Sequence, residues 1–179
     1  MSPSRCRRIL EACHESILPG IVLRLFCAIR AEEVSRLDWK DITLAGADAA
    51  VTLSATVTKA GSRRIIKIPP CALSWMPKTK PDGKVLDNTH TLRKRWGDAR
   101  QDAGYGPFRS YQGKPPHPAK LDPWPRNVLR HTGISYLLAT SQDLASTAYA
   151  VGNSPSIIQR HYNGLASEKA AREFYKITR

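Results

Sequence analysis

Hydrophobic and polar residues recur with two different periods along the chain, and these periods predict where helices and strands form. Apolar residues three or four positions apart predict helices over 5–18, 31–37, 89–103 and 167–178. The continuous apolar run 20–29 suits a buried helix. Apolar and polar residues alternate over 51–57, and apolar residues return at 65–68 after a turn, so two strands are predicted there. The chain is thus predicted to be mainly α with one small antiparallel sheet within residues 39–68.

The segment 127–162 combines helix boundaries with chemically active side chains. An apolar run after Arg130 predicts a buried helix. Gly152 predicts the end of the next helix, because glycine adopts a left-handed cap without strain. The Ser-Pro pair at 154–155 predicts the start of another helix, with serine as N-cap and proline at the first helical position. Tyr162 falls at the end of that helix, so guanidinium, amide, imidazole and phenol groups are expected in one neighbourhood.

The net charge of the chain indicates what kind of partner it binds. The chain has 28 Lys and Arg against 15 Asp and Glu, a formal net charge of +13, and a pI near 10.0. So large an imbalance in a folded domain favours nucleic acid as the partner, with a solvated basic surface as the alternative. The same two alternatives apply to the basic face of the helix at 89–103. Residues 105–126, rich in proline, are predicted to be a loop.

Length and composition predict one domain over residues 1–179. No uncharged run is long enough to suggest a membrane span. The four cysteines lack CxxC spacing and are interpreted as reduced thiols of a cytoplasmic protein. The five histidines show no metal-ligand spacing, so we expect neither a metal nor a small-molecule cofactor.

Three sequence boxes resemble the catalytic domain of the tyrosine recombinase, or phage integrase, family. The family's first box, Gly-Leu-Arg-x-x-Glu-Leu, is similar to residues 28–34, where Arg30 holds the arginine position. Its second box, His-x-x-Arg-His-Thr, is similar to residues 127–132. Its third box places a glycine ten residues before the nucleophilic tyrosine, as Gly152 and Tyr162 stand here. The boxes occur in family order along nearly the whole chain.

The resemblance implies an α+β tyrosine recombinase catalytic-domain fold without the family's N-terminal core-binding domain. It also implies a metal-free reaction on double-stranded DNA by a homo-oligomer, a tetramer in the family. Tyr162 would attack a phosphodiester and form a 3′-phosphotyrosyl intermediate with a free 5′-hydroxyl. Arg30 and Arg130 would hold the phosphate. Lys59, on the hairpin after the first strand, would protonate the leaving oxygen, and the hairpin tip is expected to carry Lys59, Arg63 and Arg64.

Two positions depart from the family pattern. Asn127 stands where the family has histidine, and Asn153 stands where it has histidine or tryptophan. Asn127 can donate a hydrogen bond to a phosphate oxygen, but it cannot take up the tyrosine proton. Asn153 retains a donor. His131 and His161 are candidates to compensate.

The sequence therefore supports a site-specific recombinase or integrase as the first hypothesis. A catalytically impaired DNA-binding relative is the alternative, and a basic RNA-binding or ribosome-associated protein is a third. Glu33 is expected to support the turn that carries Arg30, without acting as a catalytic acid. The last helix is expected to pack either on its own domain or on a neighbouring protomer.

Overall fold

The computed structural model of the chain describes residues 1–58, 61, 63–86, 90–106 and 121–179. The helices are α1 (Pro3–Ala12), α2 (Leu18–Phe26), α3 (Ala31–Val34), α4 (Pro70–Leu73), α5 (His90–Asp102), α6 (Val128–Ser141), α7 (Leu144–Val151), α8 (Pro155–Tyr162) and α9 (Glu168–Phe174). The strands are β1 (Ile42–Thr43), β2 (Ala50–Leu53), β3 (Arg64–Lys67), β4 (Tyr105–Gly106) and β5 (Asp122–Pro123), and two 3₁₀ turns are η1 (Trp39–Asp41) and η2 (Gly46–Asp48).

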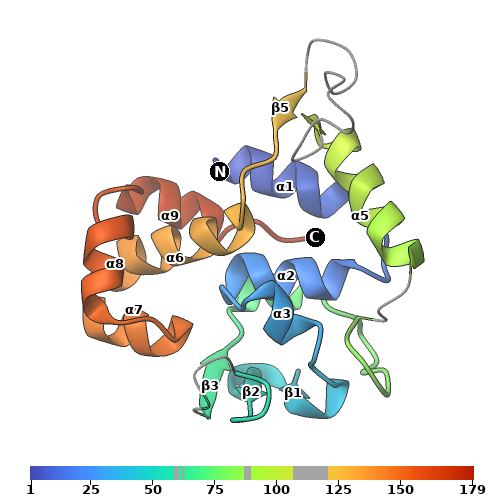
Figure 1. Cartoon of the computed structure of the whole chain (residues 1–179), viewed down its shortest axis with the longest axis horizontal. Coiled ribbons are helices and arrows are strands. Elements are labelled where there is room, and N and C mark those ends of the chain that lie inside the picture. The colour runs from blue at the N-terminus through green and yellow to red at the C-terminus, as the bar shows by residue number, and fades with distance from the viewer. Residues whose placement is uncertain (59–60, 62, 87–89, 107–120) are drawn as a thin grey trace.

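Helix α2 lies at the centre of the molecule, between three groups of elements (Figure 1). Helices α6 to α9 form one group, α3 and the sheet β1–β2–β3 form a second, and α1, α5 and the strands β4 and β5 form a third. Every residue of α2 except Arg24 is buried, as expected for a helix whose sequence is apolar on all sides. The candidate site lies where the chain just after α2 meets the start of α6, the end of α7 and the start of β3.

The helix predicted over 5–18 is shorter than expected, and a proline marks the start of the separate helix predicted from the run 20–29. Helix α1 ends at Ala12, and α2 begins at Leu18 with Pro19 in its first turn. Proline has no backbone N–H to bond to the preceding turn, so it is tolerated where a helix starts and breaks one that would run through it. The predicted last helix also ends earlier than expected, at Phe174.

The sheet is antiparallel with the order β1–β2–β3. Val51 pairs with Ile42 on one side and Ile66 on the other, and all three are buried. The strand predicted over 51–57 is shorter than expected, because β2 ends at Leu53 and the N–H of Val57 bonds to the carbonyl of Ser54 in a turn. The predicted loop 105–126 also contains the short parallel pair β4 and β5.

Helix α9 packs on its own domain. Phe174 is fully buried, with ring centroids 4.8 Å from Phe26 and 4.4 Å from Tyr136. Of the two arrangements expected for the last helix, the structure thus has the intramolecular one.

On α5, Arg95 donates to Ser16 at 2.6 Å, while Arg93 and Lys94 remain exposed.

The predicted helix boundaries around residues 152–167 are confirmed. Gly152 caps α7 with φ +66°, Ser154 accepts the N–H of Ile157 at the start of α8, and Tyr162 is the last residue of α8.

All four cysteines are free thiols. Across the described residues, no helix combines the length and apolar character needed to cross a bilayer.

Gly133 allows α6 to lie directly against α2, which leads to a stability prediction. A Cβ at this position would lie 2.2 Å from the backbone oxygen of Leu25, and backbone cannot move aside as a side chain can. Overpacking of this kind costs about 1–3 kcal/mol. Gly133→Ala should therefore lower the free energy of unfolding, measured by chemical denaturation followed by circular dichroism.

Gly97, in the middle of α5, provides the matched control, because a Cβ there meets no atom within 4 Å. Gly97→Ala should raise the free energy of unfolding by up to about 1 kcal/mol, because alanine favours the helix. A Gly133→Ala variant as stable as Gly97→Ala would contradict the close packing of α6 on α2.

Candidate active site

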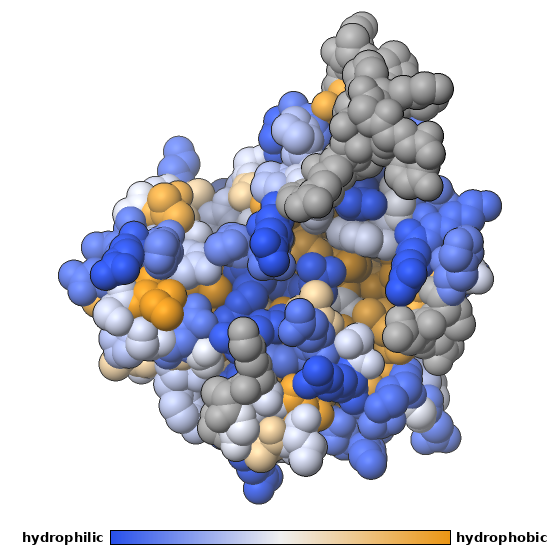
Figure 2. Space-filling view, in the orientation of Figure 1, coloured by the Kyte–Doolittle hydropathy of each residue, from blue (hydrophilic) through white to orange (hydrophobic). Residues whose placement is uncertain are grey.

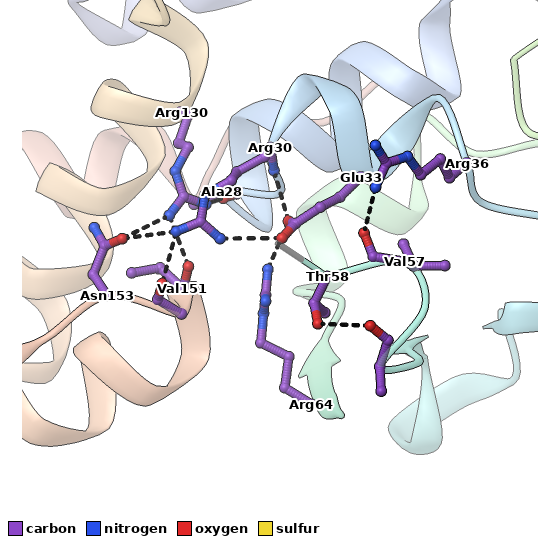
Figure 3. Close-up of polar contacts among 12 residues, drawn as sticks. Ala28, Arg30, Glu33, Arg36, Val57, Thr58, Arg64, Arg130, Val151 and Asn153 are labelled. Carbon is purple, nitrogen blue, oxygen red and sulfur yellow. Dashed lines mark hydrogen bonds and ion pairs between the residues drawn. The ribbon is translucent and has the colours of Figure 1, made fainter. Parts of the chain in front are cut away.

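Arg30 is positioned by a sharp reversal of the chain after α2. Ala28 adopts the left-handed conformation with φ +51°, which costs a residue with a Cβ roughly 1–2 kcal/mol. The chain then turns into α3, with Arg30 as its N-cap residue. In Figure 3 the Arg30 side chain runs from this turn toward Asn153, across the gap between two chain segments. The strained turn therefore directs a guanidinium toward the end of α7.

Glu33 holds this turn and its arginine in place. Its carboxylate accepts hydrogen bonds from the backbone N–H of Arg30 at 3.1 Å and from Arg30 Nη1 at 3.0 Å. It also accepts one from Arg64 Nη2 at 2.6 Å (Figure 3). The Glu33 side chain is 2% exposed, so its charge depends on these partners. This is the supporting role that the sequence suggested for Glu33.

The expectation that Arg64 lies at the hairpin tip was wrong. Arg64 is the first residue of β3, its side chain is buried, and it forms an ion pair with Glu33. Burial alternates along β3, so Arg64 and Ile66 face inward while Ile65 and Lys67 face outward. The signal was present in the sequence, because the period of two that buries Ile66 also points residue 64 to the interior. Lys59 lies outside the described residues.

Arg130 meets Arg30 at Asn153. The Arg130 guanidinium donates to the carbonyl of Ala28, to the carbonyl of Val151 at 2.7 Å and to Asn153 Oδ1 at 3.4 Å. Arg30 Nη2 donates to the carbonyl of Gly152 at 2.7 Å and to Asn153 Oδ1 at 2.9 Å. Two guanidiniums from distant parts of the chain thus share one amide oxygen (Figure 3).

Gly152 is required here for two separate reasons. Its φ of +66° is strained for any residue with a side chain, and a Cβ would lie 2.8 Å from Arg64 Nη1 and 3.3 Å from Arg30 Nη1. The end of α7 can approach the arginines closely only because this residue has no side chain. We refer below to Arg30, Arg64, Arg130 and Glu33 as the arginine cluster.

The arginine cluster has the electrostatics of an anion site. Its three guanidiniums and one carboxylate give it a net charge of +2. Burial lowers the pKa of Arg130 to about 10, and the positive charge of Arg30 adds to the effect, so Arg130 is still cationic at neutral pH. Burial raises the pKa of Glu33, but hydrogen bonds and charges from Arg30 and Arg64 outweigh it and leave that pKa lowered. Such a field suits an anion and disfavours a divalent cation.

Tyr162 sits beside this cluster with its hydroxyl bonded to a histidine. The residue is 5% exposed and packs in an apolar cluster that includes Ala28, Val151 and Ile158. Its hydroxyl lies 2.9 Å from His131 Nδ1, and the two rings are stacked with centroids 5.5 Å apart. Burial raises the pKa of Tyr162, although the charges of Arg130 and Arg30 lower it in part, so the phenol is protonated at neutral pH.

Asn127 begins α6 on the exposed surface. It is the N-cap residue, with φ +54°, and its side chain makes no capping hydrogen bond. Its carbonyl accepts the N–H of His131 at 3.0 Å. Of the six residues predicted to form the site, the structure brings Arg30, Arg130 and Asn153 into contact and places Tyr162 within the electrostatic reach of both arginines. Asn127 precedes the Tyr162–His131 pair by one helical turn, and Lys59 is not described.

No protein-family model matches the chain, and no curated protein matches its sequence. In three dimensions the chain is similar to the solved structure of XerA recombinase, with a TM-score of 0.63 and 17% sequence identity. The similarity covers 98% of this chain and 63% of the recombinase chain. The chain thus resembles this recombinase in its fold. The predicted fold is thereby confirmed, and the chain spans less than two thirds of this neighbour's length.

Removing the negative charge of Glu33 should destabilise the fold. Glu33→Gln leaves two guanidiniums facing a neutral amide in the interior, and breaking a buried ion pair in this way costs about 3–5 kcal/mol. The free energy of unfolding at neutral pH, from chemical denaturation, measures the loss. Glu32→Gln is the control, because Glu32 is the preceding residue of the same helical turn and is exposed.

The stability difference between the wild type and Glu33→Gln should depend on pH. The pKa of Glu33 is lowered from 4.5 in the folded state, so its stabilisation is fully present above that value and is lost as pH falls through the lowered pKa. The stability difference between the wild type and Glu33→Gln should therefore shrink on acidification below about pH 4.5. A difference that is constant across this range would contradict the ionised state of Glu33.

Proposed function

We propose that the chain is the catalytic domain of a site-specific recombinase or integrase that cleaves and rejoins DNA through a tyrosine. The observation that carries this proposal is the meeting of Arg30 and Arg130 at Asn153, beside the apolar cluster that holds Tyr162. These residues occupy the family's arginine and tyrosine positions. The recombinase fold of the chain supports the same function.

The arginine cluster has donors to spare for a phosphate. A guanidinium has five N–H donors, and the hydrogen bonds within the described chain use three of those on Arg30 and three of those on Arg130. The remaining two on each can bind the non-bridging oxygens of a phosphodiester. The net charge of +2 also matches the two negative charges that the phosphorus centre carries when a phenolate has attacked and the leaving oxygen is not yet protonated.

The proposed reaction keeps the phosphodiester energy in a covalent bond. The Tyr162 oxygen attacks phosphorus and the bond to the 5′-oxygen breaks, leaving a 3′-phosphotyrosyl link. The 5′-oxygen leaves as a hydroxyl after taking a proton from Lys59, the residue in the family's general-acid position. Attack of a 5′-hydroxyl on the link reverses these steps and rejoins a strand, so no cofactor takes part. Asn153 accepts hydrogen bonds from both arginines and so holds their side chains beside each other. The family has histidine or tryptophan at this position.

Double-stranded DNA is the proposed partner, and assembly into a homotetramer on DNA is part of the same proposal. The net charge of +13 supplies the attraction. Figure 2 shows the face of Figure 1 hollowed around its centre, with hydrophilic side chains around a recessed hydrophobic strip. A single domain over residues 1–179 would be the catalytic part of the enzyme, in line with its coverage of the recombinase neighbour.

The direct test is covalent trapping on a nicked duplex, from which the cleaved fragment diffuses away and cannot be rejoined. The wild type should form a protein–DNA adduct that survives a denaturing gel. Tyr162→Phe should form none, because it has no hydroxyl to attack. Arg130→Lys should slow adduct formation by roughly 10²–10³, because an ammonium cannot reproduce the donors of the guanidinium.

The exposed Arg172 of α9 provides the control, since Arg172→Lys should keep the wild-type rate. Binding of the nicked duplex without an adduct in the wild type would favour the catalytically impaired DNA-binding relative. In that case the arginine cluster would bind phosphate without chemistry.

Affinity for duplex DNA should fall steeply with salt. Each phosphate that Lys or Arg neutralises releases counterions, so the slope of log affinity against log salt is about −0.9 for each contact. Fluorescence anisotropy with a labelled duplex, between low and physiological salt, measures this slope. Duplex RNA of the same sequence should bind more weakly. Tighter binding to RNA would support the RNA-binding alternative instead.

A further inference from the structure

The Tyr162 hydroxyl already has a proton acceptor in place. His131 Nδ1 lies 2.9 Å from the hydroxyl oxygen, within the distance over which a general base acts. The stacking of the two rings, with an interplanar angle of 26°, fixes the imidazole beside the phenol. From this geometry we infer that His131 is the catalytic base that takes the Tyr162 proton, an inference that rests on the proposed function.

The position of His131 on α6 explains how the site works with asparagine at position 127. Residues four apart lie on the same face of a helix, one turn from each other. Asn127 is the N-cap of α6, and its carbonyl accepts the N–H of His131 at 3.0 Å, which is the first turn of that face. The proton acceptor therefore stands one turn further along α6 than the family's second-box histidine.

The charge state of His131 fits this role. The titratable groups that act on it are Tyr162 on α8, which bonds to it, and Arg130 on α6 and His161 on α8, whose charges reach it. Burial lowers the pKa of His131, and the charges of Arg130 and His161 lower it further. The imidazole is neutral at pH 7 as a result. With its proton on Nε2, its Nδ1 is free to accept the hydroxyl proton.

The step balances without any further reactant. As the Tyr162 oxygen forms its bond to phosphorus, its proton moves to His131 Nδ1, which becomes an imidazolium. The bond from phosphorus to the 5′-oxygen breaks, and that oxygen leaves with a proton from the general acid. In rejoining, the imidazolium returns its proton to the tyrosine oxygen as the 3′-phosphotyrosyl bond breaks.

The other candidates for this proton fit less well. His161 directly precedes Tyr162 on α8, and consecutive residues of a helix do not face each other. Asn127 carries an amide, which cannot hold an extra proton at neutral pH. His131 is the described side chain that bonds to the hydroxyl.

Single-turnover cleavage of the nicked duplex tests the inference. His131→Gln should reduce the rate of adduct formation by roughly 10²–10⁴, the range for loss of a general base, while duplex affinity stays the same. His161→Gln, which removes the neighbouring imidazole, is the matched control and should cleave at the wild-type rate at neutral pH and above, where His131 is already neutral. Circular dichroism and denaturation midpoints verify that both variants are folded.

Two readouts separate a base from a merely structural residue. The wild-type rate should fall with acidity only below pH 6.5, because the pKa of His131 is lowered from that value and a protonated imidazole cannot accept. His131→Gln should lack this decline. In His131→Gly, added imidazole should restore cleavage in proportion to its unprotonated concentration, whereas it should leave the wild type unchanged.

A substrate with sulfur in place of the 5′-bridging oxygen provides a third readout. A thiolate leaves without protonation, so this substrate rescues the loss of a general acid and leaves the loss of a general base uncorrected. His131→Gln should remain slow on it.

Wild-type adduct formation with full activity in His131→Gln would overturn the inference and leave the proposed function intact. A slow His131→Gln that the sulfur substrate restores would make His131 an acid, and would also overturn it. Absence of an adduct in the wild type on both substrates would remove the proposed function and the inference together.

Discussion

The ion pairs of Glu33 with Arg30 and Arg64 are the interaction on which the rest of the site depends. A carboxylate with 2% of its side chain exposed is stable only with its charge compensated, and here two guanidiniums from different chain segments compensate it. One partner comes from the turn after α2 and the other from β3, so the pairing fixes the sheet against the helical part of the molecule. Arg30, held in this way, extends to α7 and meets Arg130. The geometry of the arginine cluster therefore follows from a single buried negative charge.

Local rules were sufficient for the helix boundaries near the site and insufficient for its composition. Gly152, Ser154 and Pro155 have conformational preferences that act within one turn, and the predicted ends of α7 and α8 were correct. The alternation of apolar and polar residues continues beyond the end of β2, because Val57 lies in a turn and is nevertheless buried. An apolar residue at the right spacing thus shows burial, and burial alone does not specify the backbone.

The convergence of Arg30 with Arg130 could be expected only from the resemblance to the family. The two residues lie 100 positions apart, and no hydrophobic or polar periodicity in the sequence links them. The prediction of Arg64 at the hairpin tip fails because a charged side chain by itself indicates exposure, whereas the ion pair with Glu33 allows this one to be buried. The bond between Tyr162 and His131 joins α6 to α8. It depends on how those helices pack, which neither helix encodes alone.

Arg130 also closes the ends of two helices. The carbonyls that it binds belong to Val151, the last residue of α7, and to Ala28 in the strained turn after α2, and such end groups need a donor from outside their helix. The arginines are therefore structural parts of the domain in addition to their proposed role as phosphate ligands. Selection for folding alone would preserve them in a relative that does not cleave DNA. The Tyr162 hydroxyl is different, since the ring fills the apolar cluster without it and Phe would pack there equally well. Under the proposed function, replacement of this one oxygen is the change that would separate a cleaving enzyme from a relative that only binds DNA.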